Sequence, residues 1–204
     1  MLDFYYPNFK ECINYGHSRS VNPEPMDFHL HNRFEIYFFI SGSVNYLIEK
    51  KIYPLKPGDL LVMNSHEIHK PTFPKNELYE RIAIHFEPSI AKFFSPPGFD
   101  LLHCFVNRPK GEQNKINLTS SQIDKISTML RNIEATEENT GSEAPILRLT
   151  YFIELLVYIN RIFMSAKPSE ELYGIPEKLV PILDYIDTNL ESDLTLKALA
   201  EKFF

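Results

Sequence analysis

The sequence contains no tryptophan and only two cysteines, Cys12 and Cys104, among its 204 residues. Two cysteines without metal-ligand spacing form neither a disulfide framework nor a cysteine-based metal site, which favours a reduced, cytoplasmic protein. Lysine and arginine form no long run and the formal net charge is −6. Bulk charge therefore gives the chain no attraction to nucleic acid.

Long hydrophobic runs are also missing. The first ten residues, MLDFYYPNFK, lack the basic segment and apolar core of a secretory signal. The apolar stretch at 151–159 contains Glu154 and is shorter than the roughly 20 residues that cross a bilayer. We therefore expect neither export nor a membrane partner.

Short strands dominate the first half of the chain. Fifteen prolines against seven glycines, in a chain that is 44% hydrophobic, indicate many short elements joined by loops around a sizeable core. Apolar or alternating runs predict two strands within 26–40 and further strands at 44–49, 52–55, 60–63 and 80–86. Strands this short and closely spaced are typical of an antiparallel barrel or sandwich.

The segment 29–42, HLHNRFEIYFFISG, places several polar side chains on one side of a predicted strand. His29 and His31 are two residues apart and so point the same way, and Glu35 and Tyr37 share this parity. Two imidazoles and a carboxylate on one face can bind a divalent metal. They can equally line a polar pocket that hydrogen-bonds a small ligand without any metal.

The spacing of these residues resembles a known signature. His-x-His, three residues, Glu, six residues and then Gly42 is similar to the first signature of the cupin superfamily, and Gly58 and His69 match positions of the second. Four signature positions differ: Pro23 and His66 replace glycine, Asn64 replaces proline and Phe73 replaces asparagine. The resemblance implies a small antiparallel β-barrel with its site inside. For a divalent transition metal, the candidate cofactor, it implies the ligands His29, His31, Glu35 and His69.

Other side chains are candidates for the same pocket. Arg81 and His85 share a face of the strand 80–86. If this face is inward, Arg81 can pair with an anionic ligand; if it is outward, Arg81 is a surface residue beside an edge histidine. Tyr37 can stack on a sugar ring or simply pack in the barrel. No Ser/His/Asp pattern or phosphate-binding glycine loop is present, so we predict no catalytic residue. The pocket candidates are His29, His31, Glu35, Tyr37, His69, Arg81 and His85.

Helical periodicity replaces the strand pattern after residue 118. Thr119 and Gln122 form a plausible capping box for a first helix. A second helix runs from Pro145 to about Ala166 and is apolar over more than one side, so it requires cover on more than one side. We predict that this helix forms a homodimer interface, with burial inside one chain as the alternative. The predicted interface residues are Leu149, Phe152, Leu156, Ile159 and Phe163.

The last segment carries a second resemblance. The stretch ILDYIDTNLESDLTLKALAEKF resembles the opening of the DNA-binding region of AraC-type transcription regulators. Three lysines stand against six acidic residues between Pro176 and Phe204, and the chain ends before the first recognition helix of that family. We expect DNA binding only through a complete C-terminal domain, because phosphate contacts need the opposite charge.

The combined order of segments is similar to that of the AraC family. It implies a mostly β fold with C-terminal helices: a cupin-like barrel at 1–118, a dimerising helix pair at 119–166, a linker at 167–175 and the start of a helix-turn-helix domain at 176–204. The implied function is that of the sensor part of a cytoplasmic, homodimeric, non-enzymatic transcription regulator. Its partner would be a small effector, with a sugar as one candidate. The alternative is a metal-dependent cupin enzyme, an isomerase or dioxygenase.

Overall fold

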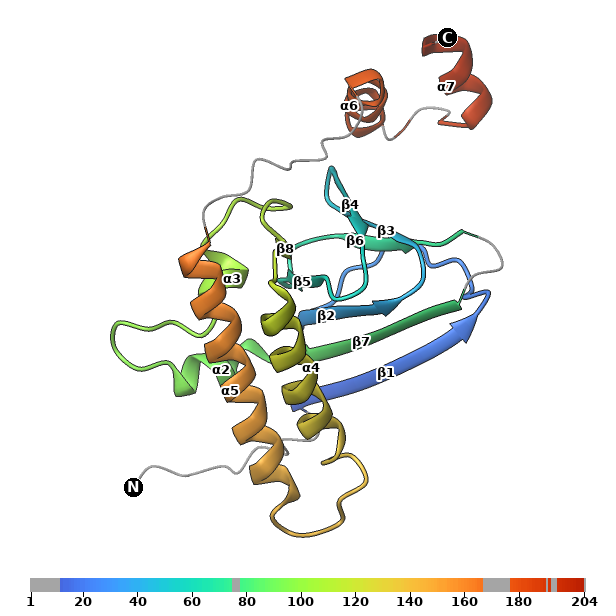
Figure 1. The fold of residues 1–204 in the computed structure, drawn as a ribbon. Coiled ribbons are helices and arrows are strands. Elements are labelled where there is room, and N and C mark those ends of the chain that lie inside the picture. Colours follow the sequence, from blue (N-terminus) through green and yellow to red (C-terminus); the bar gives the residue numbers. More distant parts are fainter. Residues whose placement is uncertain (1–11, 75–77, 167–176, 190, 192–193, 204) are drawn as a thin grey trace.

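The computed structural model describes residues 12–74, 78–166, 177–189, 191 and 194–203 (Figure 1). The strands are β1 (Ile13–Val21), β2 (Phe34–Ser41), β3 (Val44–Ile48), β4 (Lys51–Leu55), β5 (Leu60–Met63), β6 (His69–Thr72), β7 (Leu78–Phe86) and β8 (Lys115–Ile116). The helices are α2 (Pro88–Phe94), α3 (His103–Val106), α4 (Ser120–Glu134), α5 (Ala144–Ser165), the 3-10 helix η1 (Glu177–Leu179), α6 (Val180–Thr188) and α7 (Leu196–Phe203). The linker predicted at 167–175 lies outside the described residues.

Two antiparallel sheets make up the β part. One has the strand order β1-β7-β2-β5-β8 and the other the order β4-β3-β6. A buried cluster that includes Tyr37 and Met63 of the first sheet and Tyr46 and Tyr53 of the second fills the space between them. The predicted fold class is therefore confirmed as a mostly β, cupin-like arrangement followed by C-terminal helices.

Strand β2 is buried on both faces. Phe34, Ile36 and Phe38 belong to the core under the helices, whereas Tyr37 and Phe39 belong to the cluster between the sheets. Successive side chains of a strand point to opposite faces, so this division is a direct result of the strand geometry. A strand covered on both sides reads as a continuous apolar run, as the sequence here does.

At the start of the chain, one strand was missed and one predicted strand is absent. Strand β1 was not predicted, because beyond Ile13 and Tyr15 its side chains are mostly polar; pairing with β7 along all nine residues holds it in the sheet. The predicted strand before Phe34 is absent, and only His29 forms an isolated bridge, to His69. The apolar residues that suggested this strand, such as Leu30, point to solvent.

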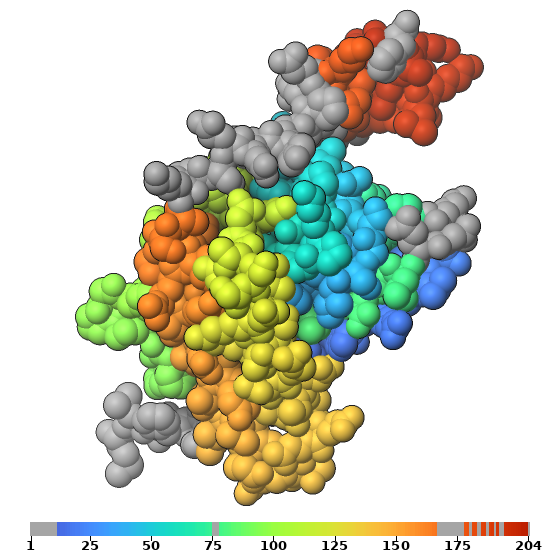
Figure 2. All heavy atoms as spheres, in the orientation of Figure 1, coloured from blue at the N-terminus to red at the C-terminus, as the bar shows by residue number. Residues whose placement is uncertain are grey.

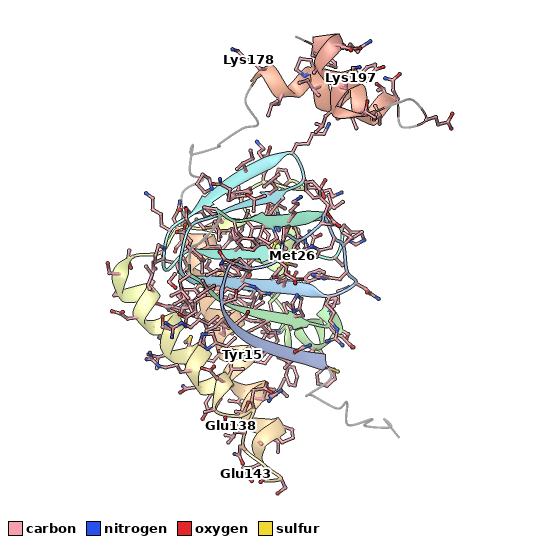
Figure 3. All side chains as sticks on the ribbon, turned by 90° about the vertical axis from the view of Figure 1, so that its right-hand side faces the viewer. Tyr15, Met26, Glu138, Glu143, Lys178 and Lys197 are labelled. Carbon is pink, nitrogen blue, oxygen red and sulfur yellow. The ribbon has the colours of Figure 1, made fainter. Side chains whose placement is uncertain are left out.

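Helices α4 and α5 cover the outer face of the larger sheet (Figures 1 and 2). Helix α4 begins with the predicted capping box, in which the backbone N–H of Gln122 donates to Thr119 Oγ1 and the backbone N–H of Thr119 donates to Gln122 Oε1. Glu138 and Glu143 mark the loop that joins the two helices, seen from the side in Figure 3.

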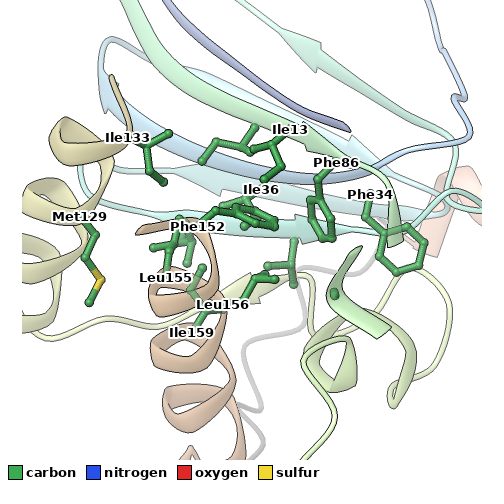
Figure 4. Close-up of a cluster of buried hydrophobic side chains, with 14 of the residues drawn as sticks. Ile13, Phe34, Ile36, Phe86, Met129, Ile133, Phe152, Leu155, Leu156 and Ile159 are labelled. Carbon is green, nitrogen blue, oxygen red and sulfur yellow. The ribbon is translucent and has the colours of Figure 1, made fainter. Parts of the chain in front are cut away.

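Helix α5 turns three of the predicted interface residues toward its own sheet, which is the burial inside one chain that the sequence left open as the alternative. Phe152, Leu156 and Ile159 are fully buried within one chain, where Phe152 packs edge-on against Phe86 at a ring-centroid distance of 4.9 Å (Figure 4). They are unavailable to a second chain because the apolar outer face of the sheet already covers them. Leu149 and Phe163 are partly buried beside the same core.

The helices predicted for the C-terminal segment are present as α6 and α7. Tyr185 of α6 and Phe203 of α7 meet edge-on with ring centroids 5.6 Å apart. None of the helices in the described part of the chain combines the length and apolar character that crossing a bilayer requires.

Candidate functional site

Five polar residues from four segments meet inside the barrel. His29 and His31 come from the chain before β2, Glu35 from the start of β2, His69 from the start of β6 and His85 from the end of β7. The backbones of His29 and His69 exchange two hydrogen bonds of 3.1 Å, and Glu35 lies directly opposite His85 in the β2–β7 register. Backbone pairing therefore brings these side chains together.

One carboxylate oxygen lies at the centre of this group. Glu35 Oε2 is 3.2 Å from His31 Nε2, 3.3 Å from His69 Nε2 and 3.4 Å from His85 Nε2. The ring of His29 completes the group, with its centroid 4.3 Å from that of His69. Glu35 and His69 are buried, but the side chains of His31 and His85 are 25% and 33% exposed. A molecule from solvent can therefore reach the group from the side of His31 and His85.

The backbone fixes how three of the imidazoles are oriented. Nδ1 of His29, His31 and His69 lies 3.1, 2.9 and 2.8 Å from the carbonyl oxygens of residues 27, 33 and 67, respectively. A carbonyl only accepts, so each Nδ1 carries the proton, and in a neutral ring Nε2 is left with a lone pair. The buried Nε2 of His69 has no hydrogen-bond partner among the described residues.

Burial and the neighbouring charges shift the pKa values of the side chains in this group. Burial works against ionisation of Glu35, but the neighbouring imidazoles of His31, His69 and His85 outweigh it and hold the pKa of this carboxyl well below its usual value. The hydrogen bond to Glu35 raises the pKa of His31, whereas burial lowers the pKa of His29. The group thus combines an anionic carboxylate with at least one imidazole that tends to stay neutral.

This donor set fits a divalent transition metal. His29, His31 and His69 form one possible ligand group, and His31, Glu35 and His85 form another, with the ligand atoms of each group within 4.8 Å of one another. Imidazole nitrogen and carboxylate oxygen are suitable ligands, and Nδ1–H bonds to backbone carbonyls are the usual support for a metal-binding Nε2. The structure divides the four predicted ligands between two groups and adds His85.

Aromatic side chains from β2, β3 and β7 continue the site next to Arg81. The hydroxyls of Tyr37 and Tyr79 are 2.8 Å apart, and the Arg81 guanidinium lies 5.8 Å from the centroid of the Tyr37 ring. The Tyr46 ring stacks near His69 with 6.0 Å between centroids. Burial raises the pKa of Tyr37 and Tyr46, so these phenols stay neutral. Sequence reasoning missed Tyr79 although it has the parity of Arg81, and it missed Tyr46.

A buried polar network behind His69 was also missed. Glu67 accepts hydrogen bonds from Arg108 at 2.6 and 2.7 Å and from the backbone N–H of Gly111 at 2.8 Å. Arg108 Nε donates to Cys104 O at 2.9 Å, and the backbone N–H of Cys104 donates to Asn160 Oδ1 on α5 at 2.9 Å. Partners so distant in sequence leave no local signal that could have revealed the network.

Comparison with known families decides the relationship. The model of the AraC-like ligand binding domain matches residues 15–156, which is more than half of the chain. The chain belongs to the AraC-like ligand-binding domain family. The matched AraC-like region contains all five residues of the polar group. No curated protein matches the sequence.

Solved structures similar to this AraC-like chain include a transcription regulator and several cupins. The AraC-like transcriptional activator CuxR is 13% identical, with 84% of this chain and 56% of CuxR covered and a TM-score of 0.45. An RmlC-like cupin from Methanocaldococcus jannaschii is 14% identical over 37% of this chain and 70% of its own, with a TM-score of 0.34. A cupin-like protein from Thermotoga maritima is 19% identical over 37% of this chain and 58% of its own, also with a TM-score of 0.34.

Proposed function

We propose that this chain is the sensor part of a cytoplasmic, one-component transcription regulator that binds a small effector inside the barrel. The observation that carries the proposal is the convergence of three Nε2 atoms on the Glu35 carboxylate, inside the AraC-like region. Lone pairs and an anionic oxygen held this close need protons or a bound cation between them. The group is therefore prepared for a ligand.

A divalent metal is a candidate component of this site. His29, His31 and His69, or His31, Glu35 and His85, would hold it. When bound, the metal would supply a Lewis-acidic position for an oxygen of the effector. The protein's own part is to orient the imidazoles through the backbone carbonyls and to leave His31 and His85 accessible.

The proposed signal leaves the barrel through the buried network. His69 is tied to the backbone of Glu67, Glu67 to Arg108, and Arg108 through Cys104 to Asn160 of α5. An effector that shifts His69 would bias the position of α5, to which the DNA-binding part is attached in sequence. A coupling free energy of about 1–3 kcal/mol is typical of such a link.

The partners proposed for the complete regulator are DNA and a second copy of the chain. DNA would be bound by the helix-turn-helix domain that α6 and α7 resemble in sequence. We propose that a homodimer forms through the outer side of α5, where Ile146 and Met164 are about half exposed. The mass of the assembly in solution, compared between wild type and Met164→Glu, tests this contact.

A metal-dependent cupin enzyme is the second candidate, because the same histidine and glutamate side chains suit a catalytic metal. A small molecule that co-purifies and leaves chemically unchanged on denaturation supports the sensor. Conversion of that molecule by the metal-loaded chain supports the enzyme.

Native mass spectrometry with Zn²⁺ as the added probe tests the site itself. We expect one ion per wild-type chain and none in a His31→Ala/Glu35→Gln variant, because each ligand group loses at least one donor. The matched control is His66→Ala, which removes an exposed imidazole from the loop before His69 and should bind zinc normally. Equal occupancy in all three proteins would remove these residues from the site.

A regulator that carries the complete DNA-binding domain gives the functional test. The His31→Ala/Glu35→Gln variant is expected to keep DNA binding in a gel-shift assay and to lose the effector response of a transcriptional reporter. A reporter response equal to that of wild type would overturn the proposed effector site.

A further inference from the structure

Arg81 places a positive charge on the inner face of the barrel. It lies on β7 between Tyr79 and Ala83, opposite Phe39 of β2 and Ser18 of β1 in the strand register. Residues with this parity, including Tyr79 and His85, face the space between the sheets. The guanidinium leans over the Tyr37 ring at 5.8 Å from its centroid.

This arginine has no acidic partner in the part of the chain that the structure describes. Its near neighbours are the phenols of Tyr37 and Tyr79, which form a hydroxyl pair of 2.8 Å. Burial keeps both phenols protonated, so they offer dipoles but no negative charge. A partly buried cation without a counter-charge is costly, and an anionic ligand would relieve this cost.

The edge strand β1, next to Arg81, leaves an opening through which a ligand can enter. Gly16 of β1 lies directly opposite Ala83 of β7. Gly16 and Asn14 are both exposed. A side chain added at Gly16 would meet nothing closer than Ala83 O at 3.9 Å, so this edge of the barrel is open. His85 is four residues from Arg81 on the same face, which is about 13 Å along the strand. Arg81 and the imidazole group therefore lie toward opposite ends of one face, with the open edge at Gly16 between them.

The charge balance indicates which kind of anion fits. Arg81 is a single guanidinium, and the carboxylate of Glu35 further along the same space would repel a highly charged ligand. One guanidinium pairs with one carboxylate through two parallel hydrogen bonds. A neutral sugar would leave the charge of Arg81 unpaired.

We propose that the effector is a small organic acid with a single carboxylate, and that Arg81 binds this carboxylate beside the Tyr37–Tyr79 pair. The inference rests on the effector-binding function proposed above and names the chemical class that the barrel accepts.

Acetate, a small monocarboxylate, tests the inference, with acetamide as its uncharged counterpart. We expect a saturable acetate titration of the backbone and Arg81 Nε–H signals in NMR spectra of the wild-type chain, and no equivalent titration with acetamide. Arg81→Gln should weaken acetate binding about tenfold to a hundredfold, in line with the loss of a hydrogen bond to a charged group. Arg81→Lys keeps the charge but loses the paired geometry, so its binding should be intermediate.

Controls separate this inference from the proposed function. Arg131→Gln on the exposed side of α4 should not change acetate binding. Retained Zn²⁺ binding by Arg81→Gln would show that its fold and imidazole group are intact. Acetate binding that survives Arg81→Gln but is lost in His31→Ala/Glu35→Gln would overturn the role of Arg81 and leave the effector site standing. Acetate binding unaffected by either variant, or equal effects of acetate and acetamide, would overturn the carboxylate class.

Discussion

The buried ion pair between Glu67 and Arg108 gives the sharpest prediction for stability. Both side chains are 0% exposed, and the two guanidinium nitrogens meet the two carboxylate oxygens at 2.6 and 2.7 Å. Burial works against ionisation of Glu67, but the pairing with Arg108 outweighs it and lowers the pKa of this carboxyl. Glu67→Gln would leave the arginine charge buried without a counter-charge. We expect it to lower the free energy of unfolding by about 3–5 kcal/mol.

Urea denaturation of four proteins measures this effect: wild type, Glu67→Gln, Arg108→Met and the double variant. The double variant should lose less than the sum of the two single variants, because it leaves no unpaired charge. The control is Lys110→Met, which breaks a pair with Glu49 whose lysine side chain is 57% exposed, and should cost less than about 1 kcal/mol. A loss below about 1 kcal/mol for Glu67→Gln would refute the reasoning.

Two further predictions concern the contact of the helices with the sheet. Burial disfavours the charged form of His17, but hydrogen bonds to Glu134 at 2.8 Å and Glu80 at 2.9 Å outweigh this and raise its pKa. The stability that these hydrogen bonds contribute is fully present below the unfolded-state pKa of 6.5 and is lost as pH rises through the higher folded-state pKa of His17. In urea denaturation, the free energy of unfolding of His17→Gln should therefore depend less on pH above 6.5 than that of wild type. Phe152→Ala should cost about 3–5 kcal/mol in the same assay and Ile146→Ala less than about 1, since only the first leaves a core cavity; similar costs would contradict this.

The strands were predictable from the sequence where a local pattern of apolar and turn residues determines them. Alternating or continuous apolar runs between turn residues were sufficient for β3, β4 and β5. Gly42 has a φ of +114°, and a Cβ there would collide with the backbone carbonyl of Leu78, so the turn after β2 requires glycine. The cause of β1 is different, because this strand is held by β7, whose paired residues come 57 to 73 positions later in the sequence. No local pattern records that pairing.

The residues of the candidate site likewise fall into those that a local pattern predicts and those that depend on strand pairing. The spacing of His29, His31 and Glu35 was visible in one segment, and the cupin signature added His69. The contact between Glu35 and His85 depends on the β2–β7 register, which joins segments 50 residues apart. The parity of β7 grouped His85 with Arg81 but left open whether their face was inward. Only the packing of Ile82 and Ile84 under the helices decides that question.

Helix α5 shows why the apolar character of a helix does not identify its partner. Its sequence indicated cover on several sides, which a second chain or its own sheet could supply. The polar Asn160 would ordinarily mark a solvent face, yet it is fully buried: its Nδ2 donates to Leu101 O and Leu156 O, and its Oδ1 accepts from the backbone of Cys104. Because these partners satisfy the amide, the side that holds Asn160 can face inward. The large apolar side chains left well exposed, Ile146 and Met164, lie near the two ends of the helix, and the dimer contact proposed for its outer side includes both.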